Sequence, residues 1–316
     1  MSGIQRGNGL HQEAIRNSVD LAVALGPQEP FIAALQSHNN QEMPPPPRLP
    51  LKLSVLMAAY NEAPTITIAV EGVLAVAAAC PCELELIVVD DGSTDGTWEQ
   101  LRQIDDDRLR LYRHDRNSGK GSAILTALTA ATGTHILPFD ADLEYDPEDI
   151  PRLIRPVLRG RCDVVYGARL FGFNTVYQSY LYAVGNRFLT RLANVLFDAH
   201  LSDLHTCLKL IPRSMVSELK LNSPGFGFDT EITAILLRRG VRPFEVPISY
   251  YSRPRARGKK ITWRDGVTCI RILLRVRLQR GIGRNPESEA SLVYTTAWDD
   301  SGATEPDAPR VISASA

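Results

Sequence analysis

Four acidic side chains occupy alternate positions in one short segment, ILPFDADLEYD at residues 136–146. Asp140, Asp142, Glu144 and Asp146 follow an apolar run directly. Carboxylates this close repel one another unless water or a cation neutralises them, and hard oxygen ligands suit Mg²⁺ or Mn²⁺. The segment is therefore either a solvated surface turn or part of a cation site, and other segments of the chain must decide between the two.

Two further segments place acids directly after an apolar run, and each run has the composition of a buried strand. In a parallel sheet the carboxyl ends of the strands meet at one edge, where ligands bind. We therefore expect the three segments to form one shared site rather than three unrelated turns. The polar residues of the two further segments are Tyr60, Asn61 and Glu62 in the first, and Asp90, Asp91 and Asp95 in the second.

The D-x-D spacing of Asp140 and Asp142 predicts a metal site that a substrate completes. One carboxylate can meet a divalent ion while its neighbour faces a sugar or a nucleoside. Magnesium commonly keeps waters and shares its other positions with substrate phosphates, rather than occupying a cage made by protein alone. The expected cofactor is Mg²⁺ or Mn²⁺, and the expected substrate carries a diphosphate.

Two segments have the composition of anion sites. In RNSGKGSAI, two glycines flank Lys120 just before a helical pattern. This arrangement favours binding of a phosphate at the start of the helix. The alternative is a simple loop in which a glycine caps the helix. The P-loop spacing is absent. The second segment runs from Arg253 to Lys260 and contains no acidic residue. Its cations either form a solvated loop or together bind an anion. The cations of that second segment are Arg253, Arg255, Arg257, Lys259 and Lys260.

The elements that must position these residues alternate between strand and helix patterns. This alternation predicts an α/β fold with a mostly parallel sheet covered by helices on both faces. The expected strands are residues 52–60, 83–91, 108–114, 134–140 and 163–169, and the expected helices are residues 64–79, 97–104, 122–132 and 147–158.

Composition sets the domain boundaries. Residues 1–50 form an N-terminal extension that ends in a run of four prolines typical of a polyproline spacer. Residues 283–316 are rich in Ser, Ala, Pro, Asp and Glu, which predicts a disordered tail. The expected catalytic domain is therefore residues 51–282.

Charge, cysteine content and hydropathy exclude several classes of protein. The 35 Lys and Arg nearly balance the 36 Asp and Glu, so no overall field favours nucleic acid. Five cysteines without paired ligand spacing argue against a zinc site. The sequence contains neither a signal-peptide pattern nor an apolar run of membrane-spanning length. We expect a cytoplasmic protein that is soluble or peripheral to the membrane.

In order and spacing, six motifs resemble family 2 of the inverting glycosyltransferases, and within it the dolichyl- and polyprenyl-phosphate sugar synthases. The resemblance covers about residues 52–270 and implies a Rossmann-like nucleotide-diphospho-sugar transferase fold of GT-A type. The donors it implies include GDP-mannose and UDP-glucose. The motifs are LMAAYNE, IVVDDGSTDGT, RNSGKGSAI, DADLEYDP, YGAR and YYSRPRARGKKITWRDG.

The resemblance also implies roles for residues that match these motifs. Tyr60 and Glu62, together with Asp90 or Asp91, match positions that hold the base and the ribose of a nucleotide sugar. Asp140, Ala141 and Asp142 match the motif that holds metal and diphosphate, and Glu144 matches a further metal-side ligand. The basic positions around the donor and acceptor phosphates match Arg169, Arg253, Lys259 and Lys260. Two departures are Ala58, where members often have Pro, and the lack of a C-terminal membrane domain found in some relatives.

The acceptor follows from charge. A sugar hydroxyl acceptor needs a carboxylate base, and Asp229 is the candidate because some members have an acid near this position; plain helix capping is the alternative. A phosphate acceptor is already an anion and needs cations instead of a base, which favours a lipid phosphate.

Two segments could bring the protein to a membrane surface. Residues 263–280 and 179–197 are candidate membrane-surface helices, and the alternative is that each packs against the domain. A soluble or glycan acceptor, and a binding module without turnover, are the other functions considered.

Overall fold

The computed structural model describes residues 50–169, 174–177, 179–219, 221, 223, 225, 227–253 and 263–279. By their contacts, all of these fall within one unit. Residues 1–49 and the expected tail lie outside the described residues, and so do Lys259 and Lys260. The predicted domain boundaries therefore remain predictions.

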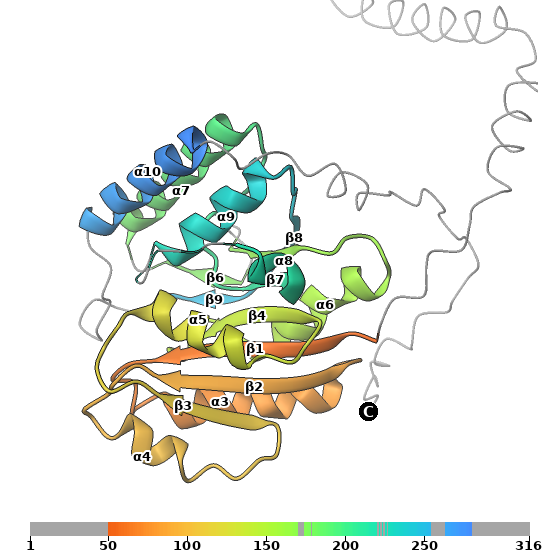
Figure 1. Cartoon of the computed structure of the whole chain (residues 1–316), viewed down its shortest axis with the longest axis vertical. Helices are drawn as coiled ribbons and strands as arrows, with labels where there is room; N and C mark the ends of the chain where they lie inside the picture. Colours follow the sequence, from red (N-terminus) through yellow and green to blue (C-terminus); the bar gives the residue numbers. More distant parts are fainter. Residues whose placement is uncertain are drawn as a thin grey trace, which may run out of the picture. The chain divides into compact units, whose positions relative to one another are not determined.

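Within the described residues, a seven-stranded sheet has the order β3-β2-β1-β4-β7-β5-β8 (Figure 1). Parallel pairing joins β3 to β2, β2 to β1, β1 to β4 and β5 to β8, whereas β7 runs antiparallel to both of its neighbours. A second, two-stranded sheet pairs β6 (Thr175–Val176) with β9 (Tyr250–Tyr251). The strands of the large sheet are β1 (Lys52–Ala59), β2 (Glu83–Asp90), β3 (Leu109–Arg113), β4 (His135–Asp140), β5 (Val165–Ala168), β7 (Lys209–Pro212) and β8 (Phe244–Pro247).

Helices cover both faces of this sheet, which confirms the predicted mostly parallel α/β fold. On one face pack α3, α4 and α6; on the other pack α5, α7, α9 and α10. The helices are α3 (Ile66–Val76), α4 (Thr97–Leu101), α5 (Lys120–Ala130), α6 (Ile150–Leu158), α7 (Tyr180–Phe197), α8 (Arg213–Ser217), α9 (Phe228–Arg238) and α10 (Trp263–Leu278), with 3₁₀ turns at Ala77–Ala79 and Pro147–Asp149.

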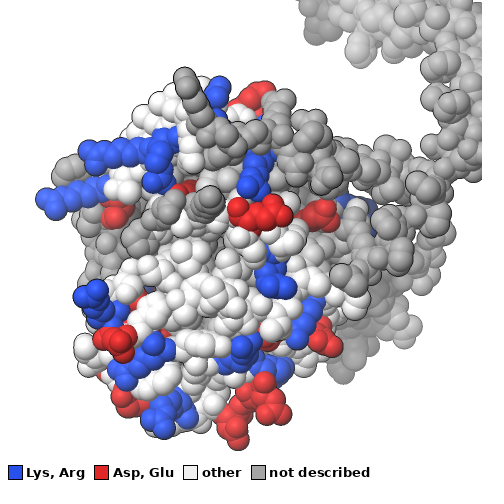
Figure 2. Space-filling model, in the orientation of Figure 1, with Lys and Arg blue, Asp and Glu red and all other residues white. Residues whose placement is uncertain are grey.

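Charged side chains are distributed unevenly over the surface (Figure 2). Acidic and basic side chains intersperse over β3 and α4, as the balanced composition leads one to expect. Over α10, basic side chains project at the upper left of the view. None of the described helices combines the length and apolar composition needed to cross a bilayer.

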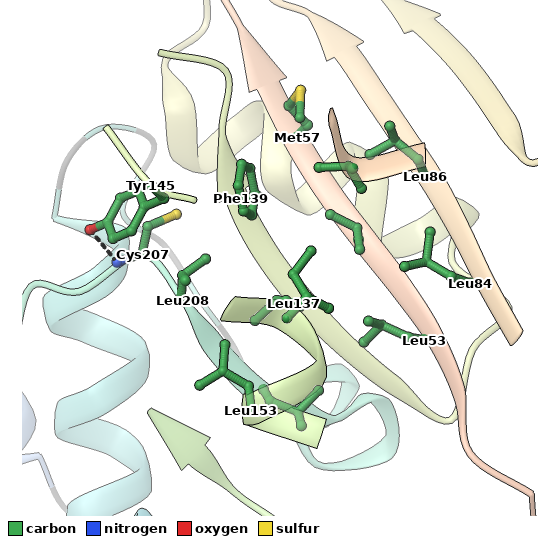
Figure 3. Packing of buried hydrophobic residues seen from close by; sticks show 14 of the residues in the cluster. Leu53, Met57, Leu84, Leu86, Leu137, Phe139, Tyr145, Leu153, Cys207 and Leu208 are labelled. Atoms are coloured by element: carbon green, nitrogen blue, oxygen red, sulfur yellow. Dashed lines mark hydrogen bonds between the residues drawn. The ribbon is translucent and has the colours of Figure 1, made fainter. Parts of the chain in front are cut away.

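The core consists of two layers separated by the sheet. Alternate residues of β1 point to opposite faces, so Leu53 and Met57 join one cluster and Leu56 joins the other. All three side chains are fully buried because both faces are covered, which explains why the strand is apolar along nearly its whole length. Figure 3 shows the first cluster, with residues of β1, β2 and β4 packed toward Leu153 of α6 and Leu208 beside β7.

Strand register brings the predicted acidic segments together. Ala59 of β1 pairs with Asp90 of β2, and Ala58 pairs with Asp140 of β4. Both pairings are parallel, so the three strands end at one level of the same edge. The convergence expected from the sequence is therefore a property of the sheet.

Candidate active site

A cavity of about 870 Å³ opens beyond the carboxyl ends of β1 and β4. Asp90 does not line it, and Lys259 and Lys260 lie outside the described residues. Asn61, Asp95 and Asp146 of the acidic segments do not line it either. The other residues for which a site role was predicted all line this cavity. They are Tyr60, Glu62, Asp91, Lys120, Asp140, Ala141, Asp142, Glu144, Arg169, Asp229 and Arg253.

Asp140 and Lys120 form an ion pair at the base of the cavity, with Lys120 Nζ 2.8 Å from Asp140 Oδ1. Gly119, at φ 94°, immediately precedes Lys120 at the start of α5. Burial alone would lower the pKa of Lys120, but the carboxylates of Asp140 and Asp229 outweigh burial and hold that pKa well above its ordinary value. Lys120 is therefore a permanent cation that neutralises acids of the site.

Asp142 is paired with Arg253, which reaches the cavity from the segment after β9. The Arg253 guanidinium donates to Asp142 Oδ2 at 3.0 Å and to the two carboxylate oxygens of Glu62 at 3.0 and 3.3 Å. Burial, followed by the charges of Asp140 and Glu144, raises the pKa of Asp142 to about 7 despite Arg253. This part of the site thus holds more negative charge than Arg253 can neutralise.

Glu144 connects the acidic segment to β9. Its Oε2 accepts a hydrogen bond from the Tyr250 hydroxyl, and its Oε1 accepts one from the Arg253 backbone N–H at 2.7 Å. Both carboxylate oxygens thus have protein donors, although the sequence predicted a metal-side ligand here. The observed contacts position Arg253 relative to Asp142.

Asp90 and Asp91, two of the three aspartates of the second segment, contact neighbouring loops and strands. Asp91 accepts hydrogen bonds from the Ser118 and Gly119 backbone N–H groups at 2.9 and 2.7 Å, which fixes the start of α5. Gly92 allows this approach, because its φ is +74° and a Cβ there would lie 2.7 Å from the Arg116 carbonyl carbon. Asp90 is fully buried, with Arg113 Nε 3.1 Å from its Oδ2. Asp90 thus contacts protein rather than the cavity.

Arg169 forms a buried bidentate pair with Asp203, at 2.5 Å from Nε and 2.9 Å from Nη2. Its guanidinium carbon also lies 4.7 Å from the centre of the Tyr250 ring. Asn186 of α7 donates to the same Asp203 carboxylate at 3.0 Å. Although the sequence predicted Arg169 as a phosphate contact, its charge is neutralised by Asp203, a residue that no sequence motif indicated.

Asp229, the candidate general base, lies between two lysines at the start of α9. Lys120 Nζ is 3.4 Å from its Oδ2 and Lys209 Nζ is 3.2 Å from its Oδ1. Burial would raise the pKa of Asp229, but the two ammonium groups outweigh burial and lower it below the ordinary value. A carboxylate with a lowered pKa is a weak proton acceptor, so this geometry does not favour a general base here.

His205, which also lines the cavity, was missed by the sequence reasoning because it has no motif around it. Asn186 directs its amide nitrogen to Asp203, so its Oδ1 accepts from His205 Nδ1–H at 2.7 Å. Burial is the main cause that lowers the pKa of His205 to about 4; Lys209 and Arg169 act in the same direction, and Asp203 and Asp229 oppose it. The folded protein thus holds a neutral imidazole.

The His205 environment predicts a pH-dependent loss of stability. The unfolded chain binds a proton near pH 6.5, whereas the folded chain binds one only near pH 4. Stability therefore falls as the pH decreases through this window, by about 2 kcal/mol between pH 7 and pH 5. We expect His205→Gln to reduce this decrease, measured by urea unfolding at each pH. An equally steep decrease in the variant would assign the pH dependence to other groups.

The donor set fits a divalent ion shared with substrate, not a preformed cage. Among the described residues, no three His, Cys, Asp or Glu side chains gather as ligands of one ion. Asp140 and Asp142 nevertheless present carboxylates to the cavity, and both have protein cations against them. Excess negative charge beside open space suits an ion whose remaining ligands are phosphate oxygens and water.

Comparisons with known proteins agree with this geometry. A family model described as glycosyl transferase family 2 matches residues 54–220. The chain is 29% identical over 206 residues to glycosyltransferase AglJ of Haloferax volcanii, with 65% of each chain covered. It is 30% identical over 174 residues to dodecaprenyl-phosphate galacturonate synthase of Rhizobium johnstonii, covering 54% of this chain and 51% of that one. The matches thus span about half to two thirds of these relatives' length.

Solved structures share the fold. Glucosyl-3-phosphoglycerate synthase from Mycobacterium tuberculosis, in complex with Mn²⁺, UDP-glucose and phosphoglyceric acid, superimposes with a TM-score of 0.55 at 20% identity. The match covers 72% of this chain and 80% of that one. The same enzyme with Mg²⁺ and UDP gives a TM-score of 0.52 at 19% identity.

Proposed function

The chain belongs to glycosyl transferase family 2, and from this premise we propose that it is a metal-dependent enzyme that transfers a hexose from a nucleotide sugar to a lipid phosphate with inversion. The observation that carries the proposal is the pair Asp140 and Asp142 at the strand edge, in one cavity with Arg253. The pair supports binding of a diphosphate, and the lowered pKa of Asp229, the candidate base, supports an acceptor that needs no base.

Asp140 and Asp142 would hold the divalent ion. When bound, such an ion stabilises the negative charge that develops on the leaving diphosphate. Lys120 stays in place as a buried cation beside Asp140. Arg253, which contacts Glu62 and Asp142, is the described cation best placed to contact a phosphate once the ion occupies the acidic pair.

A phosphate monoester acceptor fits the depressed pKa of Asp229. Such a phosphate carries about −1.5 to −2 charges near pH 7 and is itself the nucleophile. One of its oxygens forms a bond to the anomeric carbon from the face opposite the leaving group. The bond between that carbon and the nucleoside diphosphate breaks, and the bonding electrons leave with the diphosphate. No proton has to be removed from the acceptor in this step.

Of the relatives named above, one supports a lipid acceptor, and it does so only by its name. It is a dodecaprenyl-phosphate galacturonate synthase, which is a polyprenyl-phosphate sugar synthase. The solved structures with the same fold are of an enzyme named for a soluble phosphate acceptor, but at 20% identity they bear on fold rather than on substrate. Phosphate chemistry is common to both kinds of acceptor, so the test must separate lipid from soluble phosphates.

Transfer assays with radiolabelled GDP-mannose and UDP-glucose test the proposal. With Mn²⁺ or Mg²⁺ and detergent-dispersed polyprenyl phosphate, we expect label to appear in a lipid fraction, and chelation by EDTA should abolish this signal. Transfer only to 3-phosphoglycerate or another soluble phosphate would contradict the lipid acceptor. Binding of nucleotide diphosphates, seen as a rise in Tm, without any product would contradict an enzymatic function.

A further inference from the structure

The end of the cavity away from the acidic strands is formed by two helices, α7 and α10, which pack side by side (Figure 1). The polar side chains that they contribute to the lining are Tyr182, Asn186 and Asp265, together with the Cys269 thiol. The remainder of their lining is apolar or lacks a side chain. These residues are Leu181, Ala183, Gly185 and Leu189 of α7, and Gly266 of α10.

Gly185 and Gly266 leave space in this part of the cavity. A Cβ atom built at either position meets no heavy atom of the described residues within 4 Å, so packing among them does not require glycine there. Gly227 differs, because its Cβ would lie 2.5 Å from Ile272 Cδ1. Glycine inside a helix is less stable than alanine. Gly185, which is exposed, and Gly266, which is half-buried, both line the cavity, so the space beside them indicates room kept for a ligand.

The apolar lining continues onto the outer surface of α7. Leu181 lines the cavity and is also 77% exposed. Tyr180, Val184 and Phe188 are exposed as well, and their spacing places all four on one side of the helix. Leu181 therefore joins the interior lining to an exposed apolar stripe.

The charges on α7 and on the neighbouring α10 suit an anionic lipid. α7 contains Arg187 and Arg191, both exposed, and no acidic residue. Exposed Arg271 and Arg277 lie on α10, over which basic side chains project in Figure 2. Apolar side chains mixed with cations are typical of helices at anionic membrane surfaces. A protein partner could cover such a stripe but would not account for the open space at Gly185 and Gly266.

We propose that the cavity between α7 and α10 binds the hydrocarbon chain of the acceptor, which leaves over Leu181 along the outer side of α7. This inference rests on the proposed function, since it assigns a route to the lipid of that acceptor. Gly185 and Gly266 keep the route open, so a side chain at either position fills the space that the first isoprene units occupy.

Photocrosslinking of a long polyprenyl phosphate with a diazirine in its chain, in detergent micelles, tests the route by binding alone. We expect crosslinks to peptides of α7 and α10. Unlabelled long-chain polyprenyl phosphate should compete strongly with this crosslinking, whereas geranyl phosphate should compete only weakly. Gly185→Leu and Gly266→Leu should weaken lipid binding by about tenfold or more, because each added side chain takes the place of lipid hydrocarbon that would otherwise be buried in the cavity. Nucleotide diphosphate with Mn²⁺ should still raise Tm in both variants.

Matched controls distinguish a loss of lipid binding from misfolding and from a loss of sugar transfer. Thr268→Leu adds the same side chain to α10 at an exposed position outside the lining, and should bind like the wild type. Unchanged lipid binding by both glycine variants, or equal competition by geranyl phosphate, would overturn the proposed route. Crosslinking to α7 and α10 without any sugar transfer would support the route while contradicting the proposed function.

Discussion

Replacing Asp142 with asparagine is expected to reduce metal-dependent transfer by about a thousandfold or more. Several kcal/mol of stabilisation of the leaving diphosphate depend on the divalent ion, and asparagine lacks the charge that holds it. The fold should be preserved, because burial and the charges of Asp140 and Glu144 already raise the pKa of Asp142 to about 7. A neutral side chain is therefore tolerated at this position. Initial rates over a range of Mn²⁺ concentrations, together with Tm, measure both effects.

Asp146→Asn is the matched control for this prediction. Asp146 belongs to the same acidic run but does not line the cavity, and its Oδ1 accepts from the Glu148 backbone N–H at 2.9 Å. Asparagine can accept the same hydrogen bond, so activity and its metal dependence should stay near those of the wild type. Full activity of Asp142→Asn, or an equal loss in Asp146→Asn, would remove Asp142 from the proposed metal site.

The convergence of the acidic segments was predictable because it follows from sheet topology. Apolar runs at residues 52–60, 83–91 and 134–140 indicated strands with both faces buried, and the structure has strands there. Parallel strands joined by helices must end at the same edge. Once that alternation was recognised, no knowledge of side-chain contacts was needed to place Asp91 and Asp140 at one cavity.

The partners of the charged groups could not be predicted in the same way. Arg253 was expected to meet phosphates, yet it lies between Glu62 and Asp142. The partner of Arg169 is Asp203, 34 residues away in a loop without a motif. Local periodicity encodes which face of an element is buried, but not which side chains from distant loops meet. The antiparallel insertion of β7 between β4 and β5 likewise has no local signal.

Asp203→Ala is expected to be the most destabilising of these substitutions, by about 3–5 kcal/mol, because it leaves Arg169 as a buried charge without its partner. The Arg169 and Asp203 side chains are only 10% and 3% exposed. Asp203 also accepts hydrogen bonds from Asn186 and from the His205 backbone N–H, so the loss spreads to the loop before β7. Urea unfolding at pH 7 measures it.

The double variant Arg169→Met with Asp203→Leu tests whether Arg169 serves to pair with Asp203 or to bind the phosphates of the donor. If Arg169 serves mainly to hold Asp203 and pack on Tyr250, two apolar side chains of similar volume should restore more than half of the lost stability. The rise in Tm with nucleotide diphosphate and Mn²⁺ should then match that of the wild type. Restored stability without any such rise would instead place Arg169 in contact with the donor, as the sequence motif first suggested. Because both readouts come from one folded variant, a loss of binding cannot be attributed to unfolding.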